Sequence, residues 1–258
     1  MIEFISAGLS TQAFLAAMAV TFFAGIVKGS VGFAMPMILV SAFAVFLPAN
    51  LALAGLILPT LFTNISQAFR QGVPAAQETA VTYHRFLVGT VICIALSAPF
   101  AEVIPRAVYL MLLGLPITVF AGLQLMGVNL AIKLHHRNRA EWGLGVIGGL
   151  YGGISGIWGP PLLVFLLSTG ADKLQAIRAQ GVVFLIGAVA LLAAHLGTGL
   201  ANAQTLAFSA ALTLPALAGL YTGYAVQDRL DQNRFGRWTR ALLVITGLNL
   251  VRLAVVGP

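Results

Sequence analysis

One basic residue in this sequence, Lys28, lies inside an apolar stretch, where a charged side chain is unusual. Lys28 sits in the apolar stretch GIVKGSVGFAMP, and a Lys at the centre of a bilayer costs about 2.5–3.5 kcal/mol on insertion scales. Every Asp and Glu falls in an expected loop or terminus, at Glu3, Glu78, Glu102, Glu141, Asp172, Asp228 and Asp231. Without a nearby carboxylate, the natural partner of Lys28 is a bound anion. The alternative is a lysine near a helix end that extends to the membrane interface.

The glycines around Lys28 recur in the second half of the chain. The pattern GxxxGxxGxxxP occurs twice at one constant offset, as Gly25, Gly29, Gly32 and Pro36 and as Gly149, Gly153, Gly156 and Pro160. Interrupted helices expose backbone N–H groups with a partial positive charge, and glycine lets a ligand approach that backbone closely. Two such breaks predict an anion site near the membrane midplane. Close packing of helices through small residues is the alternative reading.

Other polar side chains lie close to these breaks or in the segments that follow them. Ser30 and Ser155 supply hydroxyls and Trp158 an indole N–H, while Asn64 and Gln180 each lie in the segment after a break. Interhelical hydrogen bonding is the alternative for the two amides. The predicted substrate-binding residues are Lys28, Gly29, Ser30, Gly32, Asn64, Gly153, Ser155, Gly156, Trp158 and Gln180, and the predicted helix-break residues are Gly25, Pro36, Gly149 and Pro160.

The composition explains what must position these residues. Of 258 residues, 59% are apolar and 8% are charged, with a mean hydropathy of +0.97, whereas soluble domains carry roughly a quarter charged residues. The solvent of this chain is therefore lipid. A net charge of +7 does not indicate nucleic-acid binding, because the basic residues lie in short gaps between apolar runs.

Ten apolar segments predict an all-α polytopic membrane protein. They run over 10–27, 30–47, 51–69, 86–100, 107–128, 142–154, 157–168, 177–196, 204–225 and 238–256. A full crossing needs about 20 residues, so the short pair around Ser155 is expected to form half-helices. The first segment has no basic region or cleavage site before it, so we expect it to be retained.

The duplicated motif divides the chain into two repeats. We expect a first repeat over 1–128, a basic cytoplasmic linker over 129–141 and a second repeat over 142–258. Five segments in each half invert the repeats and place both termini outside. The basic loops 70–85, 129–141, 170–178 and 227–240 then share the cytoplasmic side, as the positive-inside rule requires.

Catalytic and metal-binding patterns are not found in the sequence. It has no phosphate-binding loop, HExxH or CxxC motif, and its glycines lie in apolar helical runs rather than after a strand. We therefore expect no enzyme, no cofactor and no metal site. His195, near the outer end of its span, leaves a coupling proton open as a partner.

The segments GIVKGSVGFAMP and GGLYGGISGIWGPPLL resemble the signature repeats of the TauE/SafE family of membrane permeases. The second motif, with Pro160 and Pro161, is the more typical, whereas the first has Lys28-Gly29-Ser30 in place of a glycine run. This resemblance implies a bacterial inner-membrane permease for sulfur-containing anions such as sulfite, sulfonates, sulfoacetate or thiosulfate.

Together these observations predict a secondary transporter of a small organic or inorganic anion that works by alternating access. Its partners are the anionic substrate and the lipid bilayer, and its energy comes from a proton gradient or from the anion gradient and membrane potential. An anion channel is the main alternative, and a membrane scaffold or a membrane enzyme is a weaker one. The sequence leaves the oligomeric state open.

Overall fold

The computed structural model describes residues 2–132, 135–227 and 232–256, and these residues form helices joined by short connections. The helices are α1 (Ile2–Ile5), α2 (Thr11–Val31), α3 (Met35–Phe46), α4 (Ala49–Ala68), α5 (Val73–Thr82), α6 (His84–Ser97), α7 (Phe100–Val103), α8 (Arg106–Leu125), α9 (Arg137–Ser155), α10 (Gly159–Ser168), α11 (Lys173–Thr198), α12 (Ala203–Gln227) and α13 (Gln232–Val256). Each of the ten expected apolar segments contributes to a helix, which confirms the all-helical class.

Several of these helices are long and apolar enough to cross a membrane. By length and composition there are six, or seven if α5 and α6, which meet at a bend of 79°, count as one broken span; the six are Thr11–Val31, Ala49–Ala68, Arg106–Leu125, Leu174–Thr198, Ala203–Ala225 and Gly236–Val256. Large apolar side chains remain exposed on them, including Leu15 at 58% and Leu214 at 74%. Lipid is the solvent that suits such surfaces.

Some residues that we expected in loops belong to helices. Helix α5 lies inside the expected loop 70–85, α9 begins inside the expected linker 129–141, and α11 begins inside the expected loop 170–178. Glu78 therefore lies in α5 and Glu141 in α9, and Glu102 lies in the short helix α7. The sequence boundaries followed hydropathy, but a helix continues through polar residues at its ends as long as its backbone hydrogen bonds can form.

The first Gly-rich motif does not divide one span into two halves. Helix α2 is a complete candidate span of 21 residues, and the break follows it. Of the four helices that flank the two breaks, the short ones are those after the breaks, with 12 residues in α3 and 10 in α10. Each motif therefore ends a longer helix and starts a short one.

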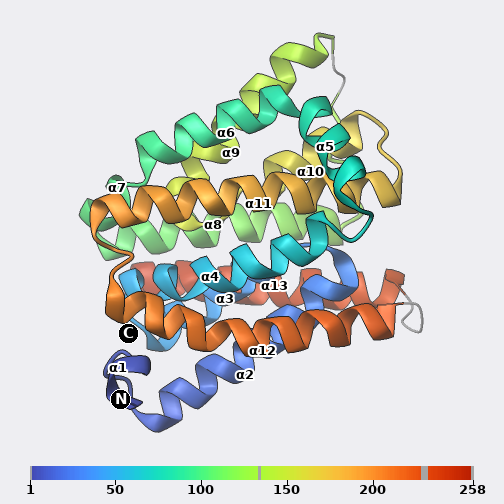
Figure 1. Ribbon diagram of the computed structural model, residues 1–258. Helices are drawn as coiled ribbons and strands as arrows, with labels where there is room; N and C mark the ends of the chain where they lie inside the picture. The colour runs from blue at the N-terminus through green and yellow to red at the C-terminus, as the bar shows by residue number, and fades with distance from the viewer. Residues whose placement is uncertain (1, 133–134, 228–231, 257–258) are drawn as a thin grey trace. The chain divides into compact units, whose positions relative to one another are not determined.

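The chain forms two compact units that are interleaved in sequence. The first unit comprises Met1–Pro59, Glu102–Val128 and Leu200–Pro258, and the second comprises Thr60–Ala101 and Asn129–Gly199. In the first unit α2 packs along α12 and α8 along α13; in the second, α6 packs along α9, and α11 contacts both α5 and α6 (Figure 1). Each unit takes helices from both expected repeats, so the units do not coincide with the repeats. The two repeats and their inverted orientation therefore remain predictions.

Candidate functional site

The first two glycines of the first motif allow α2 and α12 to approach at backbone distance. A Cβ atom on Gly25 would meet the carbonyl oxygen of Ala216, and one on Gly29 would meet that of Leu220. From the other side, a Cβ on Gly223 would lie 2.8 Å from the Cα of Gly29. Helix packing therefore explains these two glycines without a ligand.

The second motif uses its first two glycines in the same way, against α6. A Cβ on Gly149 would meet the backbone of Thr90, and a Cβ on Gly153 would meet the hydroxyl of Ser97. The Ser97 hydroxyl also donates a hydrogen bond to the carbonyl of Gly149, at 3.2 Å. This contact joins α6 and α9 through a polar bond as well as through close packing.

The third glycine of each motif ends a helix. Gly32 closes α2 with φ +89° and Gly156 closes α9 with φ +71°, a left-handed backbone that side chains with a Cβ rarely adopt. Their N–H groups donate to the carbonyls four residues earlier, both at 2.7 Å. Pro36 and Pro160 lie in the first turn of the next helix, where proline fits. The motif is thus a stop-and-restart signal for two helices.

Lys28 lies in the last turn of α2, inside the first unit. Its side chain is only 1% exposed, so it does not extend to an exposed surface. The carbonyl end of a helix carries a partial negative charge, which favours a cation at this position. The six candidate spans contain no Asp or Glu. The neighbouring Ser30 donates its hydroxyl proton to the carbonyl of Ile26, at 2.9 Å.

Trp158 occupies the second break, directly before α10. Its ring lies edge-on to Phe184 with centroids 6.2 Å apart, and a Cβ on Gly187 would be 2.8 Å from the ring. The side chain is 2% exposed, and its indole N–H has no hydrogen-bond partner among the residues that the structure describes. A buried donor without an acceptor is unfavourable, and a bound acceptor would satisfy it.

Gln180 lies on the side of α11 that faces Trp158. It precedes Phe184 by four residues and Gly187 by seven, so helical spacing places all three on one face. The side chain is 5% exposed, and its amide oxygen finds no hydrogen-bond donor within the described ranges. The second unit therefore holds a buried donor and a buried acceptor on neighbouring elements, neither of which has a hydrogen-bond partner among the described residues.

The end of α4 packs against the same region of α11. The Gln67 amide donates to the carbonyl of Ile177 at 3.1 Å, and a Cβ on Gly181 would meet the backbone of Ala68. Asn64, one turn earlier in α4, is fully buried. The second unit thus contains the three predicted amide and indole side chains, Asn64, Trp158 and Gln180.

Ser155 and His195 complete the surroundings of the second break. The Ser155 hydroxyl donates to the carbonyl of Tyr151 at 2.7 Å and accepts from the N–H of Ile157 at 3.1 Å, so it stabilises the turn. His195, fully buried in α11, places Nε2 3.1 Å from the carbonyl oxygen of Gly153. His195 is not among the predicted substrate-binding residues, although it follows Gln180 by 15 residues and lies near the same helix face.

A comparison of the whole chain with models of known families is decisive for its classification. The model for the sulfite exporter TauE/SafE family matches residues 17–250. The chain belongs to this family. No curated protein and no solved structure matches the chain. The TauE/SafE chain is therefore a multi-pass membrane transporter rather than an enzyme.

One of the three acidic residues of this TauE/SafE chain that lie in helices rather than in the expected loops has a clear structural role. Glu141 belongs to α9 and is 1% exposed. Its carboxylate accepts from the backbone N–H groups of Arg85 and Phe86, at 3.1 and 3.3 Å, and lies 3.9 Å from the Arg85 guanidinium. Glu141 caps the start of α6, a structural role that only the packing of α6 on α9 reveals.

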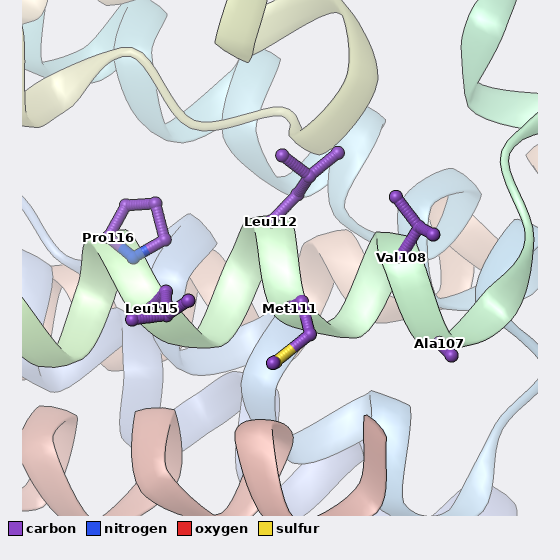
Figure 2. Close-up of a pocket in the computed structure, with 6 residues that line it drawn as sticks. All are labelled: Ala107, Val108, Met111, Leu112, Leu115 and Pro116. Carbon is purple, nitrogen blue, oxygen red and sulfur yellow. The ribbon is translucent and has the colours of Figure 1, made fainter. Parts of the chain in front are cut away.

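An apolar hollow on α8 does not suit an anion. A hollow of about 480 Å³ is lined by apolar residues of α8, shown in Figure 2: Ala107, Val108, Met111, Leu112, Leu115 and Pro116. It offers no polar side chain, and it lies on a helix apolar enough to span the membrane. Lipid chains suit this surface better than a charged substrate does.

The predicted site residues of the transporter fall into two sets. Lys28, Gly29, Ser30 and Gly32 lie in the first unit, whereas the second unit holds Asn64, Gly153, Ser155, Gly156, Trp158 and Gln180. Among the described residues, no group of three His, Cys, Asp or Glu side chains could hold a metal ion.

Proposed function

We propose that this transporter exports a small sulfur oxyanion or sulfonate, such as sulfite or sulfoacetate, across the bacterial inner membrane by alternating access. The family supports transport of a sulfur-containing anion. A cytoplasm-negative potential drives an anion outward with about 2.3 kcal/mol per charge per 100 mV, so export needs no nucleotide hydrolysis. We further propose inverted repeats with both termini on the periplasmic side.

The observation that carries this proposal is the burial of Lys28 in a span without carboxylates. Its side chain is 1% exposed, and none of the six candidate spans supplies an Asp or Glu. The polarity of the α2 carbonyl end offsets part of the cost of a buried ammonium, but a dipole end is worth about 0.3–1 kcal/mol, up to ~2 when partly buried. An anionic substrate offsets more, because a hydrogen bond to a charged group contributes about 1.5–3 kcal/mol.

The second unit supplies neutral groups that suit an oxyanion. The Trp158 N–H donates and does not accept, so it favours an oxygen atom of the substrate. The Gln180 amide presents both a donor and an acceptor, which suits a partly protonated anion such as hydrogen sulfite. His195 contacts Gly153 beside this break and is the group at which proton coupling would act.

Ligand-dependent thermal stability of the purified transporter tests the proposal. Sulfite, thiosulfate, sulfoacetate, taurine and acetate are added separately to the wild type, to Lys28→Met and to Arg252→Gln. Arg252 is the matched control, because it is an exposed basic residue at the far end of α13 that bonds to Asn249. A ligand that binds only the folded state raises the melting temperature by mass action.

We expect a sulfur oxyanion to stabilise the wild type and the Arg252 variant. Loss of the charged contact in Lys28→Met should weaken binding about 10- to 100-fold, as a charge-assisted hydrogen bond predicts. Equal stabilisation of the Lys28 variant would remove Lys28 from the site. Saturable counterflow in proteoliposomes is expected for a transporter, and flux without saturation would instead indicate the channel alternative.

A further inference from the structure

A second cavity lies at one end of the α8–α13 pair, within the first unit. The two helices run antiparallel, since a Cβ on Gly114 would meet Leu250, whereas a Cβ on Gly247, one turn earlier in α13, would meet Thr118, one turn later in α8. The end of α8 therefore lies beside the start of α13. There a cavity of about 360 Å³ is lined by Leu125, Arg234, Arg237, Trp238 and Ala241.

The depth of this cavity matches the membrane surface. The candidate span of α13 begins at Gly236, so the cavity arginines lie at its boundary. Trp238 is 75% exposed, and tryptophan is enriched at the level of lipid headgroups. Leu125 and Ala241 add apolar walls towards the span. The arrangement therefore offers positive charge at the headgroup level and apolar contact below it.

Arg237 is the leading cation of the cavity. It is exposed and has no hydrogen bond or ion pair among the described residues. Arg240, one turn further on, instead donates its Nε–H to the carbonyl of Gly236 at 2.9 Å and does not line the cavity. An arginine fork matches the oxygens of a phosphate group and binds them through two parallel N–H bonds.

We propose that this cavity binds the phosphate headgroup of an anionic phospholipid. The guanidinium groups of Arg237 and Arg234 contact the phosphate, Trp238 packs on the glycerol region, and the apolar walls receive the first acyl carbons. A water molecule occupies about 30 Å³ of liquid, so the cavity suits a glycerophosphate rather than one small ion. Basic pockets between spanning helices bind lipid headgroups by the same physics. The inference is independent of the transported substrate.

Native mass spectrometry of the full chain with added lipid tests this site. Phosphatidylglycerol and phosphatidylcholine of equal chain length are titrated against the wild type, Arg237→Gln, the double variant Arg234→Gln/Arg237→Gln and the control Arg252→Gln. A third arm adds inorganic phosphate and glycerol phosphate as competitors. Melting temperatures in phosphatidylcholine show that each variant is folded.

We expect the wild type and the Arg252 variant to prefer phosphatidylglycerol. Each lost arginine contact should lower that preference about fivefold, since one basic residue near an anionic surface contributes about 1 kcal/mol, which corresponds to a factor of about five. Equal binding of both lipids by the wild type, or an unchanged preference in the double variant, would overturn the proposal. Competition by inorganic phosphate at the same concentration as the lipid would also overturn it, in favour of a free-phosphate site.

Discussion

The two Gly-rich motifs use their glycines and proline alike but differ in side-chain chemistry and at one backbone position, where Ala34 has φ +78° and Trp158 has φ −126°. In each, two glycines pack against a neighbouring helix, a third ends the helix in a left-handed turn, and a proline starts the next helix. Yet the position of Lys28 in the first motif is held by Gly152 in the second, and the position of Trp158 is held by Ala34 in the first. The glycines and the proline therefore have the same roles in both motifs, whereas the side chains between them differ.

The divergence follows a compensation of volume. A Cβ on Gly152 would lie 2.8 Å from the ring of Trp158, so the glycine makes room for the indole. In the first motif Lys28 is a large buried side chain, and the position equivalent to Trp158 is the small Ala34. At this pair of positions the large side chain therefore stands before the turn in one motif and after it in the other. Two similar helix breaks can thus carry a charge in one case and a neutral donor in the other.

The largest effect is expected from the glycines that both motifs share. Gly29→Ala and Gly149→Ala should each destabilise the protein by about 3 kcal/mol, because the new methyl group meets backbone atoms that cannot move away. Thermal unfolding in detergent measures this. Gly143→Ala is the control, since a Cβ there has nothing within 4 Å. A large loss in one motif and none in the other would contradict the equivalence of the two frames.

A smaller loss of stability is expected where Gly152 makes room for the Trp158 ring, a contact that the first motif lacks. Gly152→Ala is expected to cost about 1–2 kcal/mol, because its methyl group overlaps the Trp158 ring. In a Trp158→Ala background the same change should cost little, since the overlap is gone. A double-mutant cycle on melting temperature measures the coupling. Additive effects of the two changes would show that Gly152 does not serve Trp158.

The smallest effect on stability should come from the indole nitrogen. Trp158→Phe removes a buried N–H that has no partner in the described structure, so stability should change by less than about 1 kcal/mol. If the N–H meets substrate, the binding constant for sulfite should weaken about threefold to tenfold. Calorimetric titration measures it, with Trp142→Phe as the control on the exposed face of α9. Unchanged sulfite binding would make Trp158 a packing residue only.

Hydropathy predicted the helices well and their ends poorly. All ten apolar segments contribute to helices, since burial in lipid requires internal backbone hydrogen bonds. The expected loops include the polar first turns of α9 and α11, because hydropathy alone places a boundary at a charged residue. Glu141 was misplaced for the same reason. Glu141 directly precedes an apolar run, which could have indicated that it belongs to the same helix. Its contact with the start of α6 cannot be predicted from the sequence.

The candidate site was predictable in part. Lys28, Trp158 and Gln180 were found from residue type and distance to the motif, and the structure buries all three. His195 is not among the predicted substrate-binding residues, although helical spacing from Gln180 places it near the same face. The role of the motif glycines could not be settled from their pattern, because a ligand and a helix both favour the same lack of a side chain.

The sequence by itself determined that this protein is helical and embedded in a membrane, and that the pattern GxxxGxxGxxxP occurs once in each half of the chain. Hydropathy and glycine spacing are local properties, so no tertiary contact is needed to read them. Only the tertiary structure decided that α2 packs on α12 and α6 on α9, that Lys28 is buried rather than extended to an interface, and that Glu141 serves a helix distant in sequence. Those outcomes depend on which helices pack together. The apolar helices have similar hydropathy, so hydropathy cannot choose the pairs, and close packing of their surfaces does.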